Sequence, residues 1–511
     1  MKTHVKKRFL LPALAASLGW LPASPTTAQT NFATLHSFTA PISPYYTNSD
    51  GVNPQGGLLL AGDILYGTAY KGGASDEGTV FAMKGDGTGF TTLHGFTNIV
   101  DAGSPIAGLV ASGNTLYGAA EFGGPAYKGG VFAINTNGTG FTYLHTFTAG
   151  AFNAVPGYFT NSDGAAPWGG VILSGNTLYG TTQGGGLTGA GTVFVVNTDG
   201  TGFTNLHTFT AMATSSDATN SDGGAPAGSL ILSGNTLYGT TELGGSAGFG
   251  TVFAINTDGT GFTNLYAFTN GSDGGFPYAG LVLSGNTLYG TASEGGDSSQ
   301  GTVFAINTDG TGFATLHSFS ATPSYPGPYT NSDGATPYAG LILSGNTLYG
   351  TAYNGGSSGN GAVFGVNTDG TGFTNLYSFT ALPPYAGGSA PPSTNSDGAN
   401  PYAGLILSGS TLYGTAYHGG ASGYGTVFSL SLQGSVHQTV NPPQLTIVPS
   451  GGNIILTWPT NAAGFILQAA GSLANPVWTP LPVSMVINGK FQFSEPMQTN
   501  SAGRFYRLSS Q

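Results

Sequence analysis

Aromatic and carboxylate side chains recur at two positions of a repeated sequence pattern where the residue type changes from copy to copy. The first position follows an Asp-Gly turn by a few residues, and we call its occupants the mouth residues: Gln55, Ile106, Trp168, Ala227, Tyr278, Tyr338 and Tyr402. The second is the pair of residues before each Gly-Gly: Tyr70-Lys71, Glu121-Phe122, Gln183-Gly184, Glu242-Leu243, Ser293-Glu294, Tyr353-Asn354 and Tyr417-His418. Flat aromatic rings cover the C–H patches of sugars, and nearby polar groups orient the hydroxyls. This combination predicts a carbohydrate-binding surface.

The residues selected as ligand-binding candidates are Trp168, Tyr278, Tyr338, Tyr402, Tyr70, Lys71, Tyr353, Tyr417, His418, Glu121, Glu242 and Glu294. We expect a non-enzymatic binding or adhesion protein that recognises a glycan or a cell-surface protein. One alternative is a polysaccharide-degrading glycosidase or lyase that uses a glutamate of this set, which requires carboxylates roughly 5–10 Å apart. A second alternative is a structural scaffold in which the tyrosines only plug a channel.

Two further sets of polar residues favour structural roles. One aspartate stands in each long connection: Asp50, Asp101, Asp163, Asp222, Asp273, Asp333 and Asp397. The functional interpretation is a ring of cation-binding carboxylates, but a turn needed once per repeat explains the recurrence better. The histidines His36, His94, His145, His207 and His317 alternate with Tyr266 and Tyr377 at one position, which favours packing. The sequence shows no Ser-His-Asp set and no metal-binding spacing, so we expect no catalytic residue, metal or cofactor.

These positions lie on a repeated four-strand unit. The motif "LYG" recurs with tyrosines at positions 66, 117, 179, 238, 289, 349 and 413, spaced 51–64 residues apart. A full copy, residues 273–319, contains the apolar runs "GLVL", "TLYGTA", "GTVFAIN" and "FATLHSF", joined in pairs by short Gly-containing turns. Four strands per unit and this period predict an all-β, seven-bladed β-propeller. Its long connections emerge on one face, so sequence variation gathers there, with the mouth residues around the central channel.

The two ends of the repeat array complement each other. The chain has a fourth-strand phrase at residues 31–38 with no strands before it, whereas the last copy, residues 404–432, has no fourth strand after it. An open array would leave a bare strand edge, which is a liability for aggregation. We therefore expect the N-terminal strand to complete blade seven and close the ring.

The repeat phrase "DG..P..GL.LSGNTLYGT...GG....GTVFAINTDGTGFTNLHSF" resembles the GloVer (Gloeo/Verruco) tandem repeat of secreted bacterial proteins over about 400 residues. The blade pattern is also similar, more loosely, to kelch propellers. The resemblance implies an exported propeller and no particular activity. Residues 444–511 resemble a fibronectin-like module, which predicts a small Ig-like or fibronectin-like β-sandwich.

Composition sets the expected location and partners. Residues 1–28 have the basic start and short apolar run of a signal peptide, residues 31–432 form the predicted propeller, and residues 433–443 form a linker. The residues after the predicted cleavage carry six Lys and Arg against 21 carboxylates, a formal net charge of −15, which argues against nucleic acid. No run is long enough for a membrane span, and there is no cysteine. We expect a secreted monomer, located outside the cell, at its surface or in the periplasm.

Overall fold

The computed structural model of the chain describes residues 31–97, 103–152, 159–213, 218–323, 329–383 and 392–432, and shorter stretches between 445 and 510. The predicted signal peptide, the predicted linker and Asp101 lie outside the described residues. The chain divides into two compact units, one of which spans residues 29–433.

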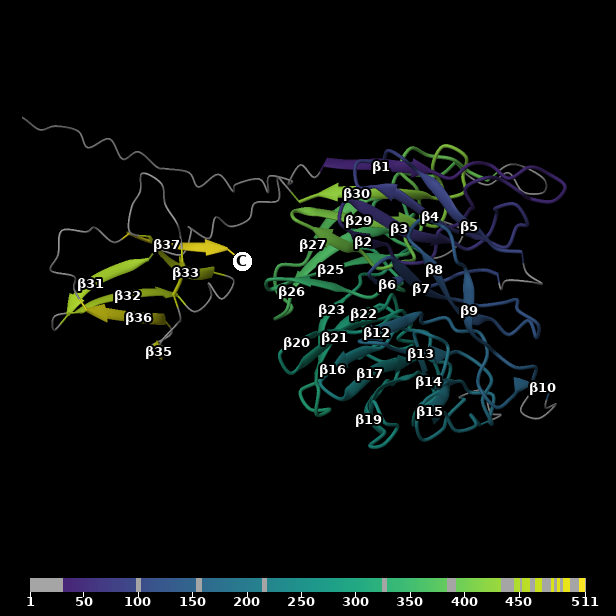
Figure 1. The fold of residues 1–511 in the computed structure, drawn as a ribbon, viewed down its shortest axis with the longest axis horizontal. Helices are drawn as coiled ribbons and strands as arrows, with labels where there is room; N and C mark the ends of the chain where they lie inside the picture. The colour runs from purple at the N-terminus through teal and green to yellow at the C-terminus, as the bar shows by residue number, and fades with distance from the viewer. Residues whose placement is uncertain are drawn as a thin grey trace, which may run out of the picture. The chain divides into compact units, whose positions relative to one another are not determined.

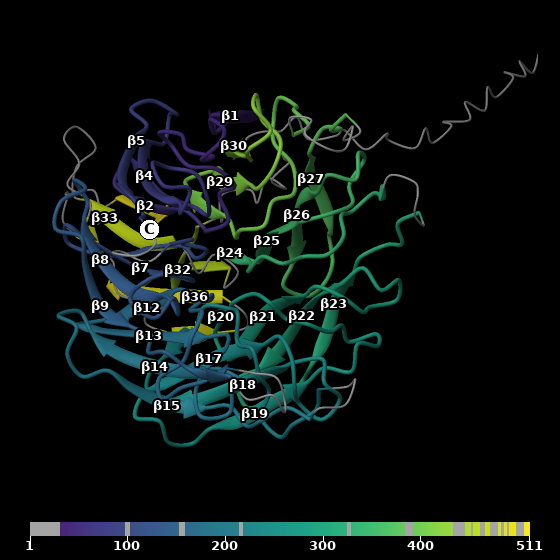
Figure 2. The ribbon, with the colours of Figure 1, turned by 90° about the vertical axis from the view of Figure 1, so that its right-hand side faces the viewer.

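Seven four-stranded antiparallel sheets form a ring, with inner strands such as β12 and β20 near the centre and outer strands such as β15 and β23 at the rim (Figures 1 and 2). Blade one contains β2 (Leu59–Ala61), β3 (Ile64–Ala69), β4 (Thr79–Lys84) and β5 (Thr91–Gly95). Blade two contains β6 (Val110–Ser112), β7 (Thr115–Ala120), β8 (Gly130–Asn135) and β9 (Thr142–Thr146). Blade three contains β12 (Val171–Ser174), β13 (Thr177–Thr182), β14 (Thr192–Asn197) and β15 (Thr204–Thr208). Blade four contains β16 (Ile231–Ser233), β17 (Thr236–Thr241), β18 (Thr251–Asn256) and β19 (Thr263–Ala267).

The remaining blades repeat this order. Blade five contains β20 (Val282–Ser284), β21 (Thr287–Ala292), β22 (Thr302–Asn307) and β23 (Ala314–Ser318). Blade six contains β24 (Ile342–Ser344), β25 (Thr347–Ala352), β26 (Ala362–Asn367) and β27 (Thr374–Ser378). Blade seven contains β28 (Ile406–Ser408), β29 (Thr411–Ala416), β30 (Thr426–Ser431) and β1 (Asn31–Ser37). A two-stranded hairpin, β10 (Ala151–Phe152) with β11 (Phe159–Thr160), lies in the connection from blade two to blade three.

Burial explains why the third run of each repeat is apolar on both of its faces. In β22 the first five residues are all buried, including Val303 and Phe304. Blade four supplies Val252 and Phe268 to the same core cluster that contains Phe304, so the core lies between neighbouring blades. A strand that is covered by a blade on each side has no solvent face, as expected of strands buried between two layers.

The ring is closed by the first strand, as the sequence predicts. Strand β1 pairs antiparallel with β30, in a register that places Asn31 opposite Ser431 and Ser37 opposite Thr426. The Phe32 ring stacks on Tyr377 of blade six at 4.1 Å between centroids. The fourth strand that the last repeat lacks is therefore supplied from the other end of the array, and blade seven has the same four strands as the other blades.

A second contact joins neighbouring blades at the rim. The fourth-strand His or Tyr of each blade stacks on a phenylalanine of the next blade, with centroids 3.5–4.1 Å apart. The pairs are His36–Phe90, His94–Phe141, His145–Phe203, His207–Phe262, Tyr266–Phe313, His317–Phe373 and Tyr377–Phe32. The packing role predicted for this position is confirmed.

The six loop aspartates that the structure describes bind these same side chains, a contact that the sequence did not predict. Asp222 Oδ2 lies 2.9 Å from Nε2 of His207, and its carboxylate also accepts hydrogen bonds from the backbone N–H and the hydroxyl of Thr210. Tyr266 donates its hydroxyl proton to Asp273 in the same way. Burial raises the pKa of Asp222, but the hydrogen bonds from His207 and Thr210 outweigh it and hold the pKa below its ordinary value. Each of these aspartates therefore links a long connection, through hydrogen bonds, to the strand that precedes it.

The aspartates of the "NTDGTG" hairpins form turns, as predicted. Asp199 Oδ1 accepts hydrogen bonds from the backbone N–H and the hydroxyl of Thr201, two residues later, at 2.9 and 2.7 Å. The equivalent bonds recur in the other copies, for example from Thr260 to Asp258. This is the pattern of an Asx turn, in which a side chain replaces a backbone acceptor.

The C-terminal unit is also all-β. A four-stranded sheet contains β31 (Thr446–Ser450), β32 (Asn453–Pro459), β36 (Lys490–Pro496) and β35 (Met485–Ile487), and a three-stranded sheet contains β34 (Thr479–Pro480), β33 (Phe465–Ala470) and β37 (Phe505–Ser510). Leu456 and Phe493 of the first sheet share a core with Leu467 of the second. No helix within the described part of the chain could cross a membrane.

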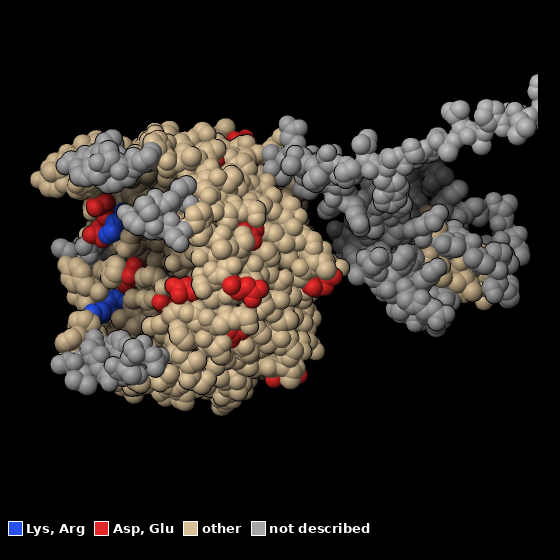
Figure 3. Space-filling view, turned by 180° about the vertical axis from the view of Figure 1, so that it is seen from behind, with Lys and Arg blue, Asp and Glu red and all other residues tan. Residues whose placement is uncertain are grey.

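Charge is sparse on the propeller. Figure 3 shows one side of it as mostly uncharged, with small groups of acidic side chains and few basic ones. In the sequence, residues 31–432 contain three lysines, Lys71, Lys84 and Lys128, and no arginine. Any cluster of charged side chains is therefore distinctive in this molecule.

Deleting residues 31–38 is expected to lower the melting temperature markedly, because blade seven loses its outer strand together with the buried Phe38 and the stacked Phe32. Circular dichroism and size-exclusion chromatography would follow the melting curve and the oligomeric state. Removing only residues 29 and 30 provides the control and should have no effect. An unchanged melting curve in the larger deletion would contradict the closure.

Replacing His207 by Ala should destabilise the propeller by about 1–3 kcal/mol, since a stacked ring contact and a hydrogen bond to a buried carboxylate are both lost. His207→Tyr should cost less than about 1 kcal/mol, because Tyr266 and Tyr377 fill the same role in other blades. Urea denaturation of both variants would measure the difference. Equal losses for Ala and Tyr would show that Tyr cannot replace His at this position.

Candidate functional site

The structure brings the mouth residues together. Gln55, Ile106, Trp168, Ala227, Tyr278, Tyr338 and Tyr402 all line one cavity of about 130 Å³. Each comes from a different blade, immediately before its inner strand, so the cavity lies at the centre of the ring, on the face where the long connections emerge. Positions spread over about 350 residues of sequence thus form a single surface.

A backbone conformation that is repeated in every blade holds the mouth residues in place. Each follows a proline, and the residue before that proline has a positive φ of 52–57°. These residues are Asn53, Ser104, Ala166, Ala225, Phe276, Thr336 and Asn400. The left-handed region is unfavourable for residues such as Ala225 and Thr336, so the surrounding contacts must compensate.

The compensating hydrogen bonds link three segments. The N–H of Ala225 donates to the carbonyl of Ala190 in the preceding blade, and its own carbonyl accepts the N–H of Glu242. The same arrangement recurs at Thr336. Its N–H donates to the carbonyl of Gln300, and its carbonyl accepts the N–H of Tyr353. Because only backbone atoms are involved, the side chains at the mouth and pair positions can vary without loss of the contact.

Four tyrosines form a contiguous aromatic cluster at the mouth. The ring centroid of Tyr338 lies 5.1 Å from that of Tyr278, in an edge-to-face contact, and 5.1 Å from that of Tyr402, in a stacked contact. Tyr353, from a pair position, contacts Tyr338 at 5.4 Å and Tyr402 at 6.0 Å. We call these four residues the tyrosine cluster. Its members are half-buried and keep part of their surface exposed.

Glu242 is fixed beside this cluster by two hydrogen bonds. Its Oε1 accepts the hydroxyl proton of Tyr278 at 2.5 Å, and its Oε2 accepts from Nε2 of Gln183 at 3.1 Å. Burial raises the pKa of Glu242, and the two hydrogen bonds counter only part of that rise. Both carboxylate oxygens are occupied, so Glu242 orients Tyr278 and Gln183.

Glu121 differs from Glu242 because its carboxylate is poorly satisfied. Its side chain is buried, with 6% of the residue exposed, and Oε2 has no hydrogen-bond partner among the described residues. Burial raises the pKa of Glu121 to about 7, which the neighbouring Trp168 indole and Lys71 ammonium only partly oppose. A pKa shifted toward neutrality is frequent among functional carboxyl groups, although Glu121 is not one of the residues that line the cavity.

The other candidates lie around these two glutamates. Lys71 Nζ is 3.6 Å from Glu77 Oε2 and 5.4 Å from the centre of the Tyr70 ring. Burial, followed by the charge of Glu121, raises the pKa of Tyr70 to about 12. The Tyr417 and His418 rings contact edge to face at 4.5 Å, and burial lowers the pKa of His418.

Glu294 is the candidate least integrated into the site. Its side chain is exposed, and its backbone pairs with Gly275. Its charge raises the pKa of Tyr338, after the larger effect of burial. Glu294 lies near the tyrosine cluster and, like Glu121 and Glu242, does not line the cavity.

Two neutral amides belong to the site although they were not selected from the sequence. Gln183 donates to Glu242, and Gln55 lines the cavity with its Oε1 unpaired among the described residues. Both occupy the variable positions, which was the available signal, but an uncharged side chain among aromatic and acidic ones drew less attention. No group of three or more His, Asp or Glu in the described residues could hold a metal ion.

The repeats match the Gloeobacter/Verrucomicrobia repeat over residues 23–158 and 150–329, more than half of the chain. The chain belongs to this family. No curated protein matches the sequence.

Solved structures are only distantly similar to this repeat protein. A puromycin-hydrolysing peptidase from Mycobacterium tuberculosis is 11% identical over 83% of this chain and 62% of that chain, with a TM-score of 0.43. Trypanosoma rangeli sialidase in complex with sialic acid is 12% identical over 88% and 68%, with a TM-score of 0.41. An oligogalacturonate lyase in complex with manganese is 10% identical over 80% and 97%, with a TM-score of 0.41. Likeness at this level carries no inference about activity.

Glu121→Gln should change the pH dependence of stability in this repeat protein. Because the folded-state pKa is raised from 4.5 to about 7, the contribution of Glu121 is fully present below pH 4.5 and is lost as the pH rises through about 7. At pH 8 the Gln variant should be more stable than the parent by about 1–3 kcal/mol, and below about pH 4 the two should be alike. Urea midpoints at several pH values would test this, with Glu294→Gln as the exposed control. A difference that does not vary with pH would show that Glu121 titrates normally.

Proposed function

We propose that the mouth of the propeller binds a glycan and that the protein is a binding or adhesion module. The observation that carries the proposal is the tyrosine cluster beside the cavity that all seven mouth residues line. Partly exposed aromatic rings next to fixed polar groups suit the alternating C–H and hydroxyl surface of a sugar.

An unpaired polar atom in the lining of the same cavity supports this ligand class. Gln55 Oε1 is an acceptor with no hydrogen-bond partner among the described residues. Leaving such a group unsatisfied costs about 1–3 kcal/mol. A hydroxylated ligand, which both donates and accepts, would relieve that cost.

The size of the cavity limits how much of a ligand can enter. At about 130 Å³ it is smaller than the 300–1,000 Å³ typical of pockets that enclose a drug-sized molecule. We therefore propose that one sugar residue, or the end of a chain, enters the mouth while the rest of the glycan stays on the surface. A shallow site of this kind suits adhesion better than complete enclosure of a substrate.

A catalytic role is the second candidate, and the state of Glu121 favours it. A carboxyl group with a pKa of about 7 can act as a general acid at neutral pH. However, Glu242 is engaged by Tyr278 and Gln183, and none of Glu121, Glu242 and Glu294 lines the cavity. Because an evident carboxylate partner for Glu121 is lacking among these candidates, we favour binding over glycoside hydrolysis or elimination.

The proposed setting is extracellular. The basic and apolar start of the sequence supports export through a signal peptide, and the family resemblance implies the same. We propose that the protein acts as a monomer, with a kelch-like propeller that carries the binding face and a fibronectin-like C-terminal module as a second contact region. The net charge of −15 after cleavage makes nucleic acid an unsuitable partner.

A glycan array with the purified protein would test the proposal, together with the double variant Tyr338→Ala/Tyr402→Ala. Loss of two aromatic contacts, each worth about 0.5–1.5 kcal/mol beyond its buried area, should abolish retention on a shallow site. Tyr127→Ala provides the control, because Tyr127 is 52% exposed and does not line the cavity. Melting curves would show that each variant folds.

The same array separates the two candidate functions. If the protein is a binding module, the triple change of Glu121, Glu242 and Glu294 to Gln should weaken retention less than the tyrosine changes do. If it is an enzyme, Glu121→Gln should remove product formation and leave retention largely intact. Equal retention of the parent and the tyrosine double variant, or no retained glycan at all, would reject the proposal.

A further inference from the structure

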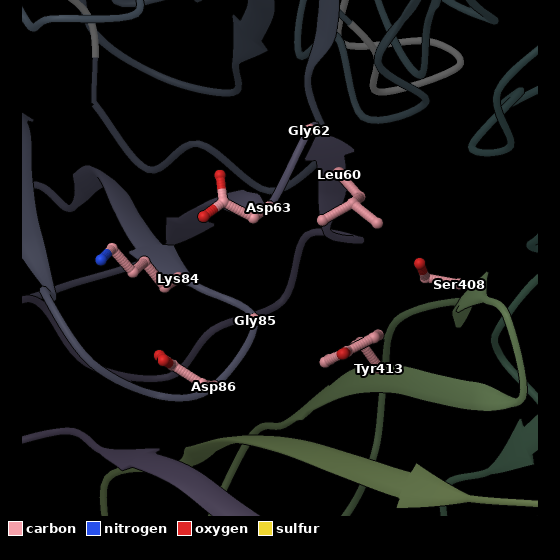
Figure 4. A pocket seen from close by; sticks show the side chains of 8 residues that line it. All are labelled: Leu60, Gly62, Asp63, Lys84, Gly85, Asp86, Ser408 and Tyr413. Carbon is pink, nitrogen blue, oxygen red and sulfur yellow. The ribbon is translucent and has the colours of Figure 1, made fainter.

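A larger cavity lies on the opposite face of the propeller, at the junction where blade one meets blade seven. Its volume is about 410 Å³, and we call it the seam cavity. Blade one contributes Asp63, Lys84 and Asp86, and blade seven contributes Ser408 and Tyr413. Figure 4 shows the charged side chains on the blade-one side, and Tyr413 and Ser408 on the green strands of blade seven. None of these residues belongs to the mouth.

The repeats provide an internal comparison that explains why the cavity is at this junction. The backbone N–H of Gly85 donates to the carbonyl of Asp63, and the equivalent bond in blade two joins Thr136 to Asn114. The position of Gly85 holds Thr in the next five blades and Leu in blade seven: Thr136, Thr198, Thr257, Thr308, Thr368 and Leu432. A Cβ at Gly85 would lie 3.3 Å from the hydroxyl of Tyr413, so a larger side chain would project against the wall of the cavity. The glycine therefore opens a space that a threonine would fill.

Two charged residues at the seam also depart from the repeat. Asp63 stands where blades two to six have Asn, and Lys84 stands where the same blades have Asn at the end of the third strand. Within the propeller repeats, residues 31–432, Lys84 is the one Lys or Arg of the short hairpins, since Lys71 and Lys128 lie in long connections. Three departures from the repeat thus coincide at one cavity.

These two charges are available to a ligand. No hydrogen bond or ion pair joins the side chain of Asp63 or Lys84 to another residue that the structure describes. Asp86 differs, because its Oδ1 accepts the hydroxyl and the backbone N–H of Thr88, as the turn aspartates of other blades do. The hydrogen bonds of Thr88 and, to a smaller extent, the nearby charge of Lys84 lower the pKa of Asp86. No hydrogen bond or ion pair with a described residue accounts for Asp63 or for the ammonium group of Lys84.

We propose that the seam cavity binds a free α-amino acid with an apolar or aromatic side chain. Its ammonium group pairs with Asp63, its carboxylate pairs with Lys84, and its side chain contacts Leu60 and the ring of Tyr413. A zwitterion satisfies two opposite charges that do not satisfy each other, whereas a purely anionic ligand would meet two carboxylates. The volume lies within the range of small-molecule pockets.

Variants that restore the repeat sequence test the proposal without changing the fold. Gly85→Thr, Asp63→Asn and Lys84→Asn each introduce a residue that occupies the same position in other blades, so the melting temperature should not fall. Isothermal titration of the purified protein with L-leucine and L-phenylalanine should show binding that each variant weakens at least about tenfold. Asp199→Asn, a carboxylate on the same face outside the cavity, should bind like the parent.

Modified probes test the zwitterion itself. N-acetyl-L-phenylalanine lacks the ammonium group and L-phenylalanine amide lacks the carboxylate, so each should bind at least about tenfold more weakly than L-phenylalanine. High salt should weaken binding, because the two charged side chains are exposed. The proposal is overturned if neither amino acid binds, if the modified probes bind equally well, or if the repeat-restoring variants bind like the parent. These outcomes do not bear on the mouth, whose ligand and variants are different.

Discussion

The contact on which the propeller depends is the junction between each outer strand and the blade that follows it. At this junction a His or Tyr ring stacks on a phenylalanine of the next blade, and in the described copies an aspartate of the long connection binds the same ring. The aromatic pair contributes packing, and the carboxylate fixes the orientation of the ring. Because each blade contacts only its neighbours, the ring is stabilised by one interface repeated around the circle. The blades need no disulfide, and the chain has no cysteine to form one.

The side chains of the mouth residues can differ from blade to blade. The residues that precede the inner strands are held by backbone hydrogen bonds and by a proline, at the cost of a left-handed conformation in every blade. Their side chains carry no part of that contact. A Tyr, Trp, Gln, Ile or Ala can therefore occupy the position, and the surface at the centre of the ring can change without a change of fold.

The sequence was informative where one structural requirement recurs in every copy. Strand number, ring closure and the gathering of the mouth residues all follow from the period and from the orphan strand at residues 31–38. The bond between Asp222 and His207 was not foreseen, because the two residues belong to separate recurring sets and 15 positions separate them. The engagement of Glu242 by Tyr278 was also hidden, because it joins two blades across a distance that only the closed ring defines. The seam cavity was missed because its unusual residues lie in short hairpins whose sequence is nearly constant in the other blades. A single different residue in such a hairpin is easily taken for neutral sequence variation.

The pairing of β1 with β30 also determines how the ring responds to force. Asn31, the first residue of β1, lies opposite Ser431, the last residue of β30, so both ends of the propeller leave from the same end of one strand pair. Tension applied through the two ends loads the hydrogen bonds of that pair one after another, as in the opening of a zipper, and does not load them together in shear. The strand pair that completes the circle is therefore also its mechanically weakest point, and a pulled molecule opens at blade seven before the other blades unravel.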